Sequence, residues 1–171
     1  MGFRTSSLLP HTRRALVAWL LAAPALAQAR PTACRPAAVL FVCPAGTVKS
    51  AIAREMLKRR AAAAGVTVEV RSRGVTPEDH VSPALAARLR ADGLDPAAEA
   101  VGRLAAGDAA QADIVVAFDE AADAPELRGA RAWRTPSWNA DYDAAKADLE
   151  ARLDALVAEL RGRNSHCASS R

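Results

Sequence analysis

A cysteine and a lysine lie six positions apart in residues 43–50, CPAGTVKS, between an apolar run and an alanine-rich segment. The small residues between them allow a tight curve, which turns several backbone N–H groups toward one point. The start of a following helix adds partial positive charge, so such a loop can hold a tetrahedral anion. The same field favours thiolate over thiol, which would make Cys43 a nucleophile. Ser50 is placed to donate a hydrogen bond to that sulfur.

Two other interpretations of this segment exist. Cys43 could be a small buried apolar residue that closes a strand, as free cysteine often is. The dipeptide KS before a helix also occurs in nucleotide-binding loops of the form G-x-x-x-x-G-K-[ST]. Both glycine positions of that motif fail here, because they are occupied by Cys43 and Val48.

Strand and helix patterns alternate along the chain around this loop. They predict strands at residues 38–42, 66–70, 113–118 and 130–134, and helices at 50–64, 83–91, 98–110 and 142–161. The alternation predicts a single three-layer α/β domain with a four-stranded parallel sheet flanked by helices. Ligands bind beyond the carboxyl ends of the strands in such sheets, and Cys43 directly follows the first strand.

The segment VLFVCPAGTVKSAIARE resembles the active-site signature C-x5-R-[ST] of low-molecular-weight protein tyrosine phosphatases and the related arsenate reductases. Further segments resemble, in order, the second strand with its S-x-G turn, the strand ending in D-x-x, the D-P loop and the closing helix. These segments are VEVRSRGV, ADIVVAFDEA, RTPSWNADYDAA and LEARLDALVAEL. The resemblance covers about residues 37–161 and implies a low-molecular-weight phosphatase-like fold.

The resemblance also implies roles for individual residues. Cys43 would take the phosphoryl group, and Ser50 would ease the departure of its thiolate. Lys49 completes the catalytic set, and Trp138 would lie at the rim of the pocket. The loop residues that would hold the phosphate oxygens are Pro44, Ala45, Gly46, Thr47 and Val48.

The chain departs from the family pattern at two positions that matter for catalysis. The family's arginine is Lys49 here, and a flexible point charge replaces a planar fork that clamps two oxygens. Loss of preorganised donors of this kind costs roughly 10²–10³ in rate. Thr135 replaces the family's general-acid aspartate. Loss of a general acid typically lowers the reaction rate by about 10²–10⁴. Asp141 or Asp143, further along the same loop, could replace the missing acid.

Two smaller departures lie in the loop itself. Gly46 stands where the family usually has an asparagine that braces the loop, and Ala45 replaces a common glycine.

Three functions follow from these residues. The first is hydrolysis of phosphate monoesters through a cysteinyl-phosphate intermediate, impaired by Lys49 and Thr135. The second is a catalytically inactive module that binds an oxyanion or a phosphorylated ligand. The third is arsenate reduction, whose thioredoxin-coupled form needs two further cysteines, and only Cys167 could serve. The expected partner is a phosphate-bearing small molecule or a phosphoprotein, without a cofactor or a metal.

The N-terminal residues have the pattern of a secretory signal peptide. Three arginines, an apolar run at residues 15–26 and the small-residue site ALAQA predict cleavage near residue 29 and a periplasmic or secreted protein. An uncleaved interfacial anchor is the alternative. Removal of residues 1–29 lowers the formal charge from +4 to +1, which argues against nucleic acid as a partner. We expect no membrane association after cleavage.

The remaining boundaries follow from composition. We expect a linker at residues 30–36, the phosphatase-like domain at 37–162 and a disordered tail at 163–171. Cys34 and Cys43 flank one predicted strand, too far apart for a disulfide.

Overall fold

The computed structural model describes residues 1–2 and 35–169 of the chain. The predicted leader, apart from its first two residues, and Cys34 lie outside the described residues. The fold below is that of the unit Ala33–Arg171.

A five-stranded parallel sheet in the order β3-β2-β1-β4-β5 forms the middle layer. Its strands are β1 (Ala37–Cys43), β2 (Val68–Gly74), β3 (Gly102–Arg103), β4 (Ile114–Phe118) and β5 (Arg131–Trp133). All seven residues of β1 are buried, which explains its continuous apolar sequence. The central strand therefore ends with Cys43 at the carboxyl edge of the sheet.

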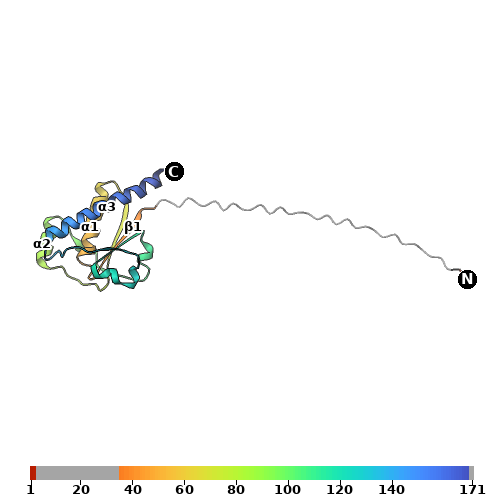
Figure 1. Cartoon of the computed structure of the whole chain (residues 1–171), viewed down its shortest axis with the longest axis horizontal. Coiled ribbons are helices and arrows are strands. Elements are labelled where there is room, and N and C mark those ends of the chain that lie inside the picture. The colour runs from red at the N-terminus through yellow and green to blue at the C-terminus, as the bar shows by residue number, and fades with distance from the viewer. Residues whose placement is uncertain (3–34, 170–171) are drawn as a thin grey trace. The chain divides into compact units, whose positions relative to one another are not determined.

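Three helices cover one face of the sheet, and short 3-10 turns cover the other. The helices are α1 (Lys49–Ala63), α2 (Pro83–Ala91) and α3 (Tyr142–Ser169), and Figure 1 shows them close together. Because side chains alternate along a strand, Phe41 packs with the helices, while Leu40 packs against the turns Asp119–Asp123 and Pro125–Leu127. The predicted three-layer α/β class is confirmed.

The region after α2 differs from the prediction. Residues 98–110 form no helix but contain the short strand β3 between the 3-10 turns Pro96–Ala98 and Ala109–Gln111. Gly107 has φ +96°, which no helix allows, and β3 pairs with the end of β2. The sheet therefore has five strands where the sequence predicted four.

Two further boundaries are shifted. β2 begins at Val68 and runs to Gly74, because it pairs with β1 along the whole length of that strand. Helix α3 continues through Ser169, where we expected disorder from residue 163. Arg163 forms an i,i+4 ion pair with Glu159, and the Asn164 side chain donates to the Thr67 carbonyl, which both support the extra turns.

The start of β4 is tied to β1 through Asp113. The Ala38 N–H donates to Asp113 Oδ2 at 2.7 Å, and Arg35 pairs with Oδ1 at 2.8 Å. These contacts, the Ala38 N–H first, hold the pKa of Asp113 below its ordinary 3.8. A lowered pKa in the folded state adds stability above the unfolded pKa and loses it as the pH falls.

We therefore expect the free energy of unfolding to fall as the pH is lowered through about 4, with a smaller decrease in Asp113→Asn. Urea titrations of both proteins between pH 3 and pH 7 measure the difference. Parallel pH profiles for the two proteins would contradict this assignment.

Candidate functional site

Cys43 Sγ lies inside the curve of the loop between β1 and α1. The Gly46 N–H donates to Sγ at 3.1 Å, and Ser50 Oγ lies 3.1 Å from it. The Cys43 side chain packs within the core cluster and the residue is 3% exposed. The Ser50 hydroxyl also lies 3.2 Å from the Gly46 carbonyl oxygen and 3.3 Å from the Arg73 carbonyl oxygen. Its one proton can turn from these acceptors to the sulfur once the sulfur is a thiolate, where it would join the Gly46 N–H as a second donor.

The carbonyl groups of the loop are held by the segment that follows β2. The amides of Val75, Thr76 and Glu78 donate to the carbonyls of Cys43, Pro44 and Ala45. A trans peptide points its N–H opposite to its C=O, so the amides of Ala45 and Gly46 point away from this segment. The bond from Gly46 to the sulfur agrees with that direction. The segment after β2 therefore holds the loop in place, with the N–H groups of the loop pointing to its inside.

Several of these N–H groups are free to bind an anion. In the part of the chain that the structure describes, the amides of Ala45, Thr47 and Val48 donate to no protein atom. Helix α1 begins without a side-chain cap and without an acidic residue in its first turn. The uncapped helix start adds further donors and a partial positive charge. These free donors are what an oxyanion would need, and the anion-binding role of the loop stays a prediction. We call residues 43–50 the anion loop after this predicted role.

Two glycines allow the loop to lie against the end of β2. Gly46 has φ +78°, and a Cβ there would lie 2.6 Å from Val101 Cγ1 and 2.9 Å from the Gly74 backbone. A Cβ on Gly74 would lie 2.8 Å from the Ala45 carbonyl oxygen. This close contact explains the absence of the family's asparagine, whose side chain has no room here.

We therefore expect Gly46→Asn to destabilise the protein by about 1–3 kcal/mol through overpacking, although asparagine tolerates positive φ. Gly65→Asn is the matched control, because Gly65 has φ +66° and nothing within 4 Å of its Cβ position. Chemical denaturation measures both variants. Equal stabilities of the two variants would show that the space around Gly46 is not limiting.

Lys49, the first residue of α1, contacts two other loops at the edge of the sheet. Its Nζ pairs with Asp119 Oδ2 and donates to the Thr135 carbonyl at 2.9 Å. The Thr135 N–H in turn donates to Asp119 Oδ1 at 3.3 Å. The loops that follow β1, β4 and β5 are joined in this way. We call Lys49, Asp119 and Thr135 the charged clamp.

Asp119 was not predicted as a site residue. The resemblance had identified its segment, ADIVVAFDEA, only as a strand ending. Its position directly after β4, the neighbour of β1, was the signal that could have identified it.

The other predicted site residues lie elsewhere. Trp138 is 3% exposed and packs edge to face on Tyr142 with ring centroids 5.2 Å apart, so it belongs to the core and not to the pocket rim. Asp141 Oδ1 accepts from the Ala144 N–H at 3.0 Å, which is the bond of a helix N-cap. Asp143 pairs with Arg88. The loop carboxylates are thus engaged in structure.

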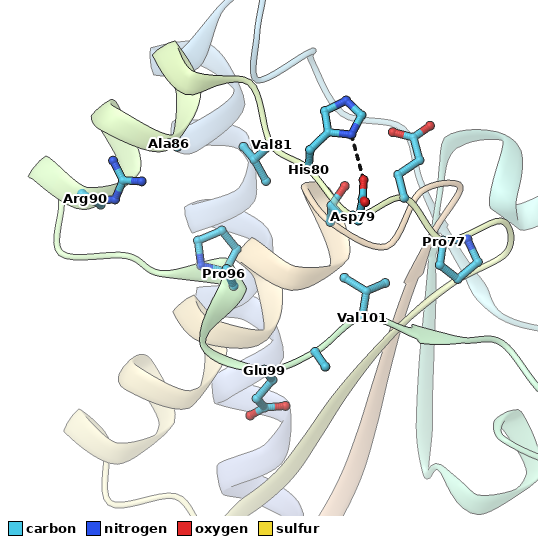
Figure 2. Close-up of a pocket in the computed structure, with 13 residues that line it drawn as sticks. Pro77, Asp79, His80, Val81, Ala86, Arg90, Pro96, Glu99 and Val101 are labelled. Atoms are coloured by element: carbon cyan, nitrogen blue, oxygen red, sulfur yellow. Dashed lines mark hydrogen bonds and ion pairs between the residues drawn. The ribbon is translucent and has the colours of Figure 1, made fainter.

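A pocket of about 830 Å³ adjoins the anion loop through Thr47 (Figure 2). The Thr47 hydroxyl is buried and has no hydrogen-bond partner in the described residues. Figure 2 shows His80 with its hydrogen-bond partner Asp79 at one end of the pocket, and Glu99 at the opposite end. The lining residues are Thr47, Pro77, Glu78, Asp79, His80, Val81, Ala86, Arg90, Pro96, Ala97, Glu99, Ala100 and Val101. Its size suits a small organic group.

No cluster of three or more metal-ligating side chains occurs among the described residues. Within the same residues, no helix is long and apolar enough to cross a membrane.

Comparison with solved structures finds the same fold in an arsenate reductase and in two phosphatases. An arsenate reductase in the phosphate-binding state has 19% identity and a TM-score of 0.60, over 72% of this chain and 98% of that chain. The YwlE arginine phosphatase from Geobacillus stearothermophilus has 22% identity and a TM-score of 0.60, over 77% and 97%. The tyrosine phosphatase Wzb from Escherichia coli K30 has 21% identity and a TM-score of 0.56, over 72% and 91%. At these identities the likeness concerns the fold.

No curated protein matches the sequence. The family model described as low molecular weight phosphotyrosine protein phosphatase matches residues 38–150, from β1 into α3. These residues include the whole anion loop and the charged clamp. The chain therefore belongs to the low molecular weight phosphotyrosine protein phosphatase family.

Proposed function

We propose that this protein hydrolyses phosphate monoesters through a cysteinyl-phosphate intermediate on Cys43. The observation that supports this most strongly is the loop itself, in which the sulfur accepts a bond from Gly46 and the neighbouring amides have no protein acceptor. A phosphoryl group held by those amides would sit next to the sulfur. This arrangement combines a nucleophile with stabilisation of the equatorial oxygens.

The reaction would proceed in two displacements. The Cys43 thiolate forms the S–P bond while the P–O bond to the leaving group breaks, and the leaving oxygen takes a proton from solvent. Water then attacks phosphorus and loses a proton to solvent, while the S–P bond breaks and its electron pair returns to sulfur. The Ser50 hydroxyl, 3.1 Å from Sγ, donates to the returning thiolate.

The substrates that suit this site carry good leaving groups. Thr135 occupies the general-acid position, and its hydroxyl cannot supply a proton at neutral pH. Asp141 caps α3 and Asp119 pairs with Lys49, so neither carboxylate is a free acid at the loop. Aryl phosphates and other activated esters need little protonation of the leaving oxygen. We propose these as the substrate class.

An inactive oxyanion-binding module is the second candidate. The pairing of Lys49 with Asp119 favours it, because the family's phosphate-clamping cation is here engaged by a carboxylate. The Cys43–Ser50 contact favours catalysis, because a binding module needs no nucleophile.

Mass spectrometry during turnover separates the two functions. The reduced full chain is mixed with p-nitrophenyl phosphate, quenched within the first turnovers, and digested. Phosphatase activity predicts release of p-nitrophenol together with one added phosphoryl group on the Cys43 peptide. Phosphate binding without p-nitrophenol release, and without the modified peptide, would identify a binding module instead.

A further inference from the structure

Asp119 has an unusual backbone for its residue type. Its φ is +52°, and it is the one non-glycine residue with positive φ among those described. Left-handed backbone is unfavourable for residues with a Cβ, although aspartate and asparagine tolerate it better than most. In this conformation the carboxylate meets both Lys49 Nζ and the Thr135 N–H. This backbone conformation thus places a negative charge next to the anion loop.

The carboxylate cancels the charge that Lys49 brings to the loop. Both side chains are 18% exposed, so solvent screens the pair only in part. Two of the three ammonium protons are used, one by Asp119 and one by the Thr135 carbonyl. A phosphate in the loop would therefore meet the backbone amides and a cation that already has a counter-ion.

We propose that Asp119 is the residue that sets the affinity of the anion loop for oxyanions, as an internal counter-ion that competes with the bound anion for Lys49. The proposal rests on the proposed function only in taking residues 43–50 as the oxyanion site. A weaker hold on inorganic phosphate would favour release of the product. An arginine at position 49 would compete less, because five donors can serve a carboxylate and a phosphate together.

Asp119→Asn tests this with little disturbance of the fold. Asparagine accepts left-handed φ and can still accept from the Thr135 N–H, so the variant removes the charge and keeps the shape. Asp123→Asn is the matched control, because it removes one acidic charge from the same turn at an exposed position. Lys49→Arg and the Lys49→Arg/Asp119→Asn double variant complete the set. Circular dichroism of each variant checks the fold.

Calorimetric titration of the reduced full chain with inorganic phosphate gives the Kd of each variant. We expect Asp119→Asn to bind phosphate about tenfold more tightly than the parent, the scale of one partly buried charged hydrogen bond. In the Lys49→Arg background, the same substitution should raise the affinity for phosphate by less than about threefold. Asp123→Asn should leave the Kd unchanged.

Unchanged or weaker binding by Asp119→Asn would overturn the proposal and would show that Asp119 instead positions Lys49 for the anion. An equal gain in Asp123→Asn would also overturn it, since the effect would then be one of net charge. These results are independent of turnover. A protein that binds phosphate as described but hydrolyses no ester would refute the proposed function alone, whereas no phosphate binding by any variant would refute both.

Discussion

Replacing Cys43 with serine is expected to reduce hydrolysis of p-nitrophenyl phosphate below detection while leaving phosphate binding within about threefold of the parent. A serine hydroxyl is not ionised near neutral pH, so the attacking thiolate is lost. Loss of the nucleophile in a covalent mechanism costs on the order of 10⁵–10⁶ in rate. The backbone amides that hold the oxygens are not changed by the substitution. The residue is 3% exposed, and serine fits the space of the thiol.

The control for this experiment is the joint replacement of Cys34 and Cys167 by serine. A phosphatase needs only one thiol, so this variant should hydrolyse the ester at the parent rate. Arsenate reduction through a disulfide relay would instead need a second cysteine. Residual hydrolysis in Cys43→Ser would show that the activity arises elsewhere. Loss of activity in the control would favour a redox mechanism over hydrolysis.

The parts of the fold set by local sequence were predictable. Helix α2 has the predicted bounds, because Ser82 caps it, Pro83 begins it and Gly93 allows the turn that follows. The central strand and its loop were recognisable for a similar reason, since a buried apolar run before small residues has few other structures. The positions of Cys43, Gly46 and Ser50 follow from that local geometry.

The parts set by tertiary contact were not predictable. Strand β3 has two residues and exists because Arg73 and Gly74 offer a free edge, a fact that no window around Gly102 contains. The alanines around it favour a helix until that pairing overrides them. Asp119 was missed for the same reason, because its role depends on the proximity of Lys49, seventy residues earlier in the chain. The anion loop is local in sequence, whereas the charge that controls it is not.

Residue 135 is a threonine at the position of the family's general-acid aspartate. Thr135→Asp is expected to accelerate hydrolysis of phenyl phosphate by about 10²–10⁴, the usual contribution of a general acid to a poor leaving group. The Thr135 backbone contacts both members of the Lys49–Asp119 ion pair, at 2.9 Å from Lys49 Nζ and 3.3 Å from Asp119 Oδ1. A carboxyl group at position 135 would therefore lie near charges of both signs, whose effects on its pKa oppose each other. Thr135→Asp should accelerate hydrolysis of p-nitrophenyl phosphate far less, because the leaving group of this ester needs little protonation.

The measurement is the rate of the parent and of each variant across aryl phosphates of increasing leaving-group pKa. The rate of the parent should decrease steeply as the leaving-group pKa rises, whereas the rate of Thr135→Asp should decrease only slightly. Thr135→Asn is the matched control, because it has the shape of the aspartate without its proton and should keep the steep dependence. If the parent already shows a shallow dependence, another group donates the proton and Thr135 does not limit the reaction. Because Asp141 and Asp119 are both engaged, in the N-cap of α3 and in the charged clamp respectively, we expect the steep dependence.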